Sequence, residues 1–323
     1  MKALGLIFLL SMGAFCLASP DSSHTDIQGK SLQQMILDEV RRLVSRLFQE
    51  YATNNYTNDS PMIVQGRMTL VSGTPVTTVN ETSLSTIYFT PYNGDKVSLY
   101  SGSIWQLFTF SETSLSISNA VSYPANTNFD IFIYNNSGTL TLTTINWTNG
   151  STRATNLTTQ NGVYVSSSNS TWRYLGTGRT TATAGQTEDS ITNRYLWNLY
   201  NQVPKILVGS DNTSHTFGGT NFVYQAWNSS SVSKVNFVTG LVLTPLTITT
   251  TAGVNTGAYA GAGLDSVTSP VNSVYNSNTS LIVLSAVGIG YPLLGYNYAQ
   301  GVESGSSASS NLTNVSIIFN LEN

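Results

Sequence analysis

The sequence is poor in charged residues, which make up 9% of its 323 residues, whereas roughly a quarter is usual in soluble proteins. The net charge is −3 and the pI is about 5.3. A chain with so little positive charge has no basic surface to attract phosphate groups. We therefore predict that nucleic acid is not a partner.

Cysteine and histidine are also scarce. Cys16 is the only cysteine, and His24 and His215 are the only histidines. One cysteine cannot form an intramolecular disulfide or a cysteine-based zinc site. Two histidines so far apart make a histidine metal cluster or a Ser-His-Asp triad difficult to build. We predict no metal ion, no cofactor and no catalytic residues.

Paired carboxylates of the glycosidase type are the remaining catalytic arrangement to consider. Glu188 and Asp189 are adjacent, so they would point to opposite faces of a strand. The other candidate acids are scattered, and no spacing nominates a pair among them: Asp95, Glu112, Asp130, Asp265 and Glu303. The sequence predicts a protein that is not an enzyme, with a glycan-degrading enzyme as a third hypothesis.

Ser, Thr, Asn and Gly are abundant instead, and aromatic residues reach 11%. This content of aromatic and β-branched residues argues against a disordered chain. From residue 62 onward, short runs of alternating apolar residues are separated by N-G, S-G and G-D turn signals, which is typical of antiparallel β-sandwiches and barrels. We predict an all-β fold with two antiparallel β-sandwich or jelly-roll-like domains, at residues 62–205 and 206–323, preceded by one N-terminal amphipathic helix.

The N-terminus reads "MKALGLIFLLSMGAFCLASP", with Lys2 followed by an apolar run and small residues. About 15 apolar residues are too few to cross roughly 30 Å of hydrocarbon comfortably. This pattern predicts a secretory signal peptide at residues 1–18, and no transmembrane span after its cleavage. The alternatives are a retained N-terminal anchor or a buried helix.

Residues 19–61 are predicted to hold a polar linker followed by an amphipathic helix over 31–51. Apolar residues recur there at spacings of three and four, while arginines occupy the other face. Such a helix either packs on its own β domain or forms a short coiled-coil neck between subunits. The self-association candidates are Leu32, Ile36, Val40, Leu43 and Leu47.

Two stretches, "TWRYLGTGR" and "NRYLWNLYNQV", combine aromatic residues with arginine. Interfaces with proteins or sugars favour this combination, because the rings stack and the guanidinium groups form paired hydrogen bonds. The stretches can equally form a sandwich core with arginines that extend to its surface. The candidate ligand or interface residues are Trp172, Arg173, Tyr174, Arg194, Tyr195 and Trp197.

The region from Gly66 to Asn323 resembles a module of tailed-bacteriophage virion proteins of the tail-fibre or receptor-binding type. The resemblance implies a non-enzymatic structural module that is exposed on a particle and is usually oligomeric. Two features depart from it, namely the signal peptide and the helix before Gly66. The runs that carry it are "STIYFTPYNGDKVSLYSGSIWQLFTFSETSLSIS", "NFDIFIYNNSGTLTL", "TWRYLGTGRTTATAGQTEDSITNRYLWNLYNQV", "VNFVTGLVLTPLTITTTAG", "AYAGAGLDS" and "LGYNYAQGVESG".

Thirteen N-x-S/T sequons are present, modestly more than this composition produces by chance. Together with a signal peptide they predict N-glycosylation, and Asn156 is the best candidate in the stretch from residue 146 to 162, because Asn149 is accounted for by an N-G turn and Asn146 by a strand edge. The sequons are Asn55, Asn58, Asn80, Asn135, Asn146, Asn149, Asn156, Asn169, Asn212, Asn228, Asn278, Asn311 and Asn314.

These observations predict a secreted, N-glycosylated structural protein that self-assembles into an extracellular or virion fibre, tubule or particle. Its expected partners are further copies of itself. The alternative is a carbohydrate- or receptor-binding adhesin of the phage tail-fibre type, whose partners would be cell-surface glycans. Either function places the protein outside the cell or on a virion surface.

Overall fold

The computed structural model describes residues 32–58, 61–218, 222–242, 244–255, 257–278, 280–305 and 311–322. The side chains of residues 32–33, 49–58 and 311 lie outside the description. The predicted signal peptide at residues 1–18 also lies outside it. Contacts between residues divide the chain into two compact units, Met1–Thr57 and Asn58–Asn323.

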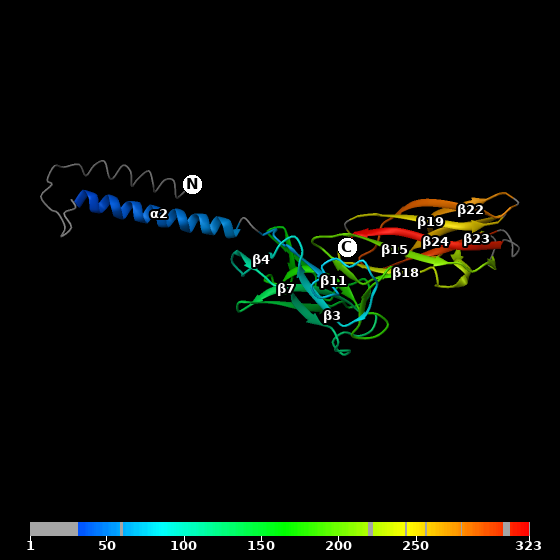
Figure 1. Ribbon diagram of the computed structural model, residues 1–323, viewed down its shortest axis with the longest axis horizontal. Coiled ribbons are helices and arrows are strands. Elements are labelled where there is room, and N and C mark those ends of the chain that lie inside the picture. Colours follow the sequence, from blue (N-terminus) through cyan, green and yellow to red (C-terminus); the bar gives the residue numbers. More distant parts are fainter. Residues whose placement is uncertain are drawn as a thin grey trace. The chain divides into compact units, whose positions relative to one another are not determined.

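The N-terminal part of the described chain is one helix, α2 (Leu32–Asn58) (Figure 1). The predicted amphipathic helix is confirmed, and it continues seven residues beyond Tyr51, to Asn58. On its polar face, Arg42 lies 2.7 Å from Glu39, one turn away, a spacing that supports a helix by a few tenths of a kcal/mol. Among the residues that the structure describes, no helix has the length and apolar character needed to cross a membrane.

The described part of the second unit consists mainly of β-strands, and all but one of its named strand pairs are antiparallel, which confirms the all-β prediction. Three sheets in its first half enclose an apolar core in which Phe89 and Phe110 stack with their ring centroids 4.8 Å apart. The first sheet holds β1 (Gly66–Thr69), β3 (Thr86–Pro91) and β6 (Thr113–Ser116), and the second holds β4 (Lys96–Tyr100) and β5 (Trp105–Thr109). The third holds β7 (Asn128–Asn136), β8 (Thr139–Asn146), β9 (Leu157–Gln160), β10 (Val163–Ser166), β11 (Arg173–Arg179) and β14 (Leu196–Asn198).

Two further sheets form a sandwich in the second half (Figure 1). Phe237 and Phe319, from opposite sheets, meet edge to face in its core with centroids 5.5 Å apart. One sheet holds β15 (Pro204–Asp211), β16 (His215–Thr216), β19 (Leu246–Val254), β22 (Ile282–Gly290) and β24 (Asn311–Glu322). The other holds β2 (Glu81–Leu84), β12 (Thr187–Asp189), β13 (Asn193–Arg194), β17 (Gln225–Ala226), β18 (Val235–Thr239), β20 (Ala258–Leu264), β21 (Pro270–Asn276) and β23 (Gly295–Gly305), with the 3₁₀ turn η1 (Trp227–Ser229) beside it.

Strands from both sides of residues 205 and 206 share one sheet. β13 pairs in parallel with β18, and Val238 of β18 packs against Tyr174 and Trp197 from the first half. A boundary between two domains at this point stays a prediction. The pairing of β13 with β18 and the packing of Val238 against Tyr174 and Trp197 both join residues before this position to residues after it.

Two glycine patterns explain local features of the sheets. Asn161 and Gly162 both have positive φ angles of 52° and 83° and form the tight turn between β9 and β10, as expected of an N-G hairpin. In β20, a Cβ on Gly261 would lie 2.1 Å from the Asn272 carbonyl oxygen, and one on Gly263 would lie 1.7 Å from that of Ser266. The absence of a side chain at these two positions therefore lets the neighbouring backbone approach β20 closely.

Candidate functional site

The aromatic and arginine residues predicted as an interface lie mainly inside the protein. Arg173, Tyr174, Arg194 and Trp197 are buried, and Trp172 and Tyr195 are half-buried. In this structure their contacts are intramolecular. An interface role for them stays a prediction.

Arg173 is fully buried and binds neutral groups. Its Nη1 donates to the carbonyl oxygens of Pro61 at 2.6 Å and Ser98 at 2.7 Å, and its Nη2 donates to the Tyr200 hydroxyl at 3.2 Å. The guanidinium also lies over the rings of Trp105 and Tyr200, 5.5 and 4.9 Å from their centroids. Burial lowers the pKa of Arg173. The side chain therefore fastens β11 to the segment at residue 61 and to β4.

A second buried arginine joins the two halves of the β region. Arg153 donates through Nε to Asp130 Oδ2 at 2.6 Å and through Nη2 to the Gly240 carbonyl oxygen at 2.6 Å. Thr177 Oγ1 donates to Asp130 Oδ1 at 2.7 Å. Burial by itself lowers the pKa of Arg153, but Asp130 and Tyr174 together raise it overall. Burial also raises the pKa of Asp130, although its hydrogen bonds to Arg153 and Thr177 act in the opposite direction. Because Gly240 follows β18, this ion pair has a structural role at the junction.

Asp189 lies between two cations at the same junction. Its Oδ1 accepts from Arg194 Nη1 at 2.9 Å, and its Oδ2 lies 3.2 Å from Lys205 Nζ. Arg194 also donates to the Ile206 carbonyl oxygen and Lys205 to that of Thr77. Asp130 and Asp189 are thus both buried and held in ion pairs inside the fold.

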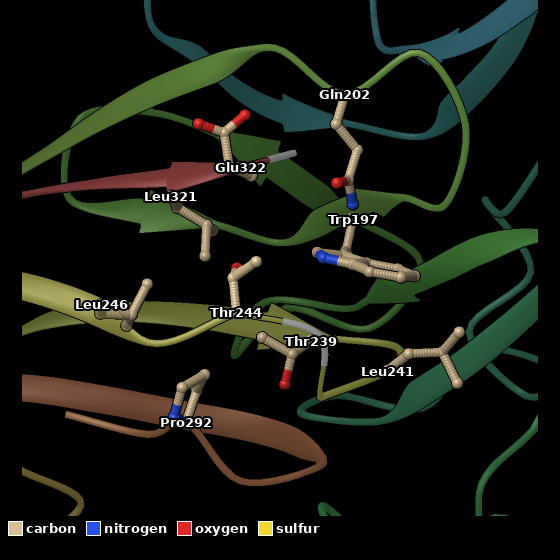
Figure 2. Close-up of a pocket in the computed structure, with 9 residues that line it drawn as sticks. All are labelled: Trp197, Gln202, Thr239, Leu241, Thr244, Leu246, Pro292, Leu321 and Glu322. Atoms are coloured by element: carbon tan, nitrogen blue, oxygen red, sulfur yellow. The ribbon is translucent and has the colours of Figure 1, made fainter.

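A small cavity lies beside Trp197 (Figure 2). Its volume is about 20 Å³, enough for a single water molecule rather than an organic ligand. Figure 2 shows the side chains of Leu246 and Leu321 from the second sandwich on the other side of this space. The lining residues are Trp197, Gln202, Thr239, Leu241, Thr244, Leu246, Pro292, Leu321 and Glu322.

A larger open cleft, of about 430 Å³, contains His215. Its Nε2 contacts Oε2 of the buried Glu303, whose Oε1 accepts from Gln225 Nε2 at 2.7 Å. Nδ1 lies 3.3 Å from the Thr213 carbonyl oxygen, and the ring meets Trp227 edge to face. The two ring nitrogens therefore face acceptor oxygens of Glu303 and Thr213. The contact with Glu303 links β16 in one sheet to β23 in the other.

The His215–Glu303 contact makes stability depend on pH. Burial alone lowers the pKa of His215. The hydrogen bond to Glu303 and the charge of Glu303 outweigh this effect, so the pKa is raised above its ordinary value. A group with a raised folded-state pKa stabilises the fold fully below its unfolded pKa, and the contribution is lost as pH rises through the folded pKa. We therefore expect the free energy of unfolding to fall as pH rises from about 6.5, the ordinary pKa of histidine, through the raised pKa of His215 in the folded protein. Denaturant titrations at several pH values should show that the free energy of unfolding depends less on pH in His215→Gln than in the native protein. The same dependence in both proteins would contradict this role.

The sequons differ in how accessible their Asn side chains are. Asn146 is half-buried and its Nδ2 donates to the carbonyl oxygen of Ser122. Asn169 is also half-buried, and its Oδ1 accepts from the backbone N–H of Thr171, just as Asn149 Oδ1 accepts from that of Ser151. Asn156 is exposed, and so is Thr158. Its glycosylation stays a prediction. Asn80, Asn135, Asn212, Asn278 and Asn314 are also exposed, Asn228 is half-buried, and the side chains of Asn55, Asn58 and Asn311 lie outside the description.

The apolar row on α2 faces solvent over most of its described length. Ile36, Leu43 and Leu47 are 44%, 45% and 54% exposed, Val40 is half-buried, and the side chain of Leu32 lies outside the description. Leu37 and Phe48 widen the exposed stripe.

Sequence reasoning missed two features. The His215–Glu303 contact joins residues 88 positions apart, and no local pattern announces such a pair. The second feature is the exposed apolar row of β22, which contains Val283, Val287 and Ile289. This strand has apolar residues at both odd and even positions, which is typical of a strand that is covered on both faces, and that signal was available.

No family model matches the chain, and no curated protein matches it. Among solved structures, a delta-endotoxin of Bacillus thuringiensis is 7% identical with a TM-score of 0.27, over 80% of this chain and 52% of that one. A β-porphyranase from Bacteroides plebeius is 8% identical with a TM-score of 0.20, over 77% and 38%. A carbohydrate-binding module of the β-sandwich superfamily is 10% identical with a TM-score of 0.17, over 81% and 100%. The chain spans about half the length of the endotoxin, and likenesses this low carry no argument about function.

Proposed function

We propose that this protein is a non-enzymatic structural subunit that self-associates through α2, and that it is secreted and N-glycosylated. The carrying observation is the exposed apolar stripe of the helix, in which Ile36, Leu43 and Leu47 recur at coiled-coil spacings. Burying such a stripe against the same stripe of further copies removes apolar surface from water. The resemblance of residues 66–323 to virion modules is compatible with an oligomer of this kind.

The charges on α2 favour further copies of the same helix as the partner. Glu39 and Arg42 satisfy each other on the polar face, and Arg41 lies 4.0 Å from Asp38. The polar face therefore needs no charged partner. The apolar stripe carries no charge that would favour a different protein over a second copy of α2. A bundle of identical helices fits both faces.

The absence of enzymatic activity is part of the proposal, and the arrangement of the acids supports it. Asp130, Asp189 and Glu303 each bind a cationic or histidine side chain inside the fold. Both ring nitrogens of His215 face acceptor oxygens. Within the described residues, no group of three or more His, Cys, Asp or Glu side chains could hold a metal ion.

Replacing Leu43 with aspartate should weaken self-association by about tenfold or more, because a carboxylate would have to enter the apolar seam. The matched control is Ser45→Asp, which adds the same group to the exposed polar face. Sedimentation velocity over a concentration series should show smaller species for Leu43→Asp alone. Equal sedimentation of both variants and the native protein would reject α2 as the assembly element.

An adhesin is the second candidate, and one aromatic cluster favours it. Tyr259 and Tyr275 lie on neighbouring strands with centroids 4.5 Å apart, and Phe222 and Tyr224 meet Tyr259 edge to face. Phe222 and Tyr275 are exposed, so sugar rings could stack on this surface. A monomeric protein that binds defined saccharides on a glycan array would favour the adhesin over the structural subunit.

A further inference from the structure

β22 exposes a row of apolar side chains that is interrupted at Ser285. Val283, Val287 and Ile289 are 74%, 65% and 63% exposed, and they alternate with residues that face the sandwich core. The row continues at the same parity beyond both ends of the strand. Its remaining apolar members, all more than half exposed, are Leu281, Tyr291 and Leu293.

The neighbouring strands extend this face without adding charge at its centre. Val287 pairs with Thr249 of β19, which pairs with Ile318 of β24, which in turn pairs with Val208 of β15. The next row across the sheet consists of hydroxyl side chains only: Ser285, Thr251, Ser316 and Ser210. A charged ligand would therefore find no partner in these two rows.

The free edge of β22 lacks the features that normally prevent pairing. β22 ends the strand order β15-β24-β19-β22 and pairs with β19 from Ile282 to Gly290 without a register shift. Within the described residues, no strand pairs with its other edge. The strand contains no lysine, no other charge, no proline and no bulge, which are the usual protections of an exposed edge.

We infer that β22 pairs edge to edge, in antiparallel orientation, with β22 of a second copy of this chain. Antiparallel pairing places residues of the same face opposite each other, so a two-fold axis perpendicular to the sheet passes through one residue of the strand. We place this axis at a residue of the exposed row. An axis near Val287 sets Ser285 against Ile289, Val283 against Tyr291 and Leu281 against Leu293. The row is thus complementary to itself, and a second copy supplies both the missing backbone partners and the apolar neighbours.

This inference deepens the proposed function, on whose self-association it rests, but it uses a different surface from α2. An isologous contact through β22 joins chains in pairs, whereas α2 gathers chains into a bundle. A chain with both contacts can extend an assembly beyond a closed oligomer. The two contacts can be tested separately because each has its own variants.

Cysteine crosslinking in the full chain tests the edge contact, with Cys16→Ser as background so that each new cysteine is the only one. Val287→Cys, Ser285→Cys and Ile289→Cys place a thiol along the row. Directly opposed Cβ atoms lie roughly 4.5–5.5 Å apart, close to disulfide reach. The matched control is Thr249→Cys, on the same face but one strand inward. Edge pairing separates the two copies of that position by about three strand spacings, or roughly 14 Å.

Under mild oxidation, at least one of the three row variants should form a covalent dimer, and Thr249→Cys should stay monomeric on a denaturing gel. The same crosslinking is expected when each variant also carries Leu43→Asp in α2. The test of the β22 contact therefore does not depend on whether the helices associate. No crosslink at any row position, or crosslinking of Thr249→Cys equal to the best of them, would overturn edge pairing. The second outcome would mean that the sheets pack face to face.

A substitution that introduces charge tests the β22 contact independently, without crosslinking. Val287→Lys sets two ammonium groups against each other near the axis, so dimer dissociation should become about tenfold easier or more. Thr249→Lys is the matched control, because it adds the same charge on the same face but does not place two lysines opposite each other. Equal effects of the two variants, at unchanged melting temperature, would contradict the inference.

Discussion

Replacing Asp130 with alanine is expected to lower the free energy of unfolding by about 3–5 kcal/mol, because it leaves the buried Arg153 guanidinium without its carboxylate. Asp130 is 1% exposed and accepts hydrogen bonds from Arg153 and Thr177. The same guanidinium bonds to the Gly240 carbonyl oxygen, so the loss would be felt on both sides of the junction. With a total stability of about 5–15 kcal/mol for a typical domain, such a variant would be marginally folded.

The double variant Asp130→Leu/Arg153→Met is the control for this prediction. It removes both charges and keeps apolar volume, so its loss should be clearly smaller than that of Asp130→Ala. Chemical denaturation followed by tryptophan fluorescence measures all three proteins. If Asp130→Ala unfolds within about 1 kcal/mol of the native protein, the ion pair does not have the structural role assigned to it.

Arg173→Ala is expected to destabilise the protein by about 3–5 kcal/mol as well, for a different reason. Truncation leaves a cavity between Trp105 and Tyr200. It also leaves the carbonyl oxygens of Pro61 and Ser98 without a donor inside the protein. Because the partners of Arg173 among the described residues are neutral, the loss comes from packing and unsatisfied acceptors rather than from an unpaired charge.

Arg173→Met separates these two contributions. Methionine fills much of the volume but donates no hydrogen bond, so we expect a loss of about 1–3 kcal/mol. Thermal unfolding by calorimetry should rank the native protein above Arg173→Met and Arg173→Met above Arg173→Ala. A methionine variant as unstable as the alanine variant would mean that the lost hydrogen bonds account for the whole effect and packing for none of it.

The fold class could be predicted from the sequence because its signals are local. Alternating apolar residues and turn pairs such as Asn161–Gly162 specify strands and hairpins, and the spacing of Ile36, Val40 and Leu43 specifies the helix. The pairing of β13 with β18 and the membership of β2 in the sheet of β23 depend on contacts far apart in the sequence. Strand periodicity carries no information about such partners.

The site residues were harder to predict for the same reason. An arginine next to aromatic residues reads alike whether it lies in an interface or in a core, and only the fold shows that Arg173 is buried. The row containing Val287 gives the opposite case. Its sequence indicates a covered strand, whereas one face and one edge of β22 are open, and this difference is the basis for placing a second copy there.

The molar mass of the native protein in solution tests self-association most directly. Size-exclusion chromatography with light scattering, after enzymatic deglycosylation and over a range of concentrations, compares it with the chain mass of 34.8 kDa less any cleaved signal peptide. The account predicts integer multiples of the protomer mass that increase with concentration. A monomer at every concentration would contradict it.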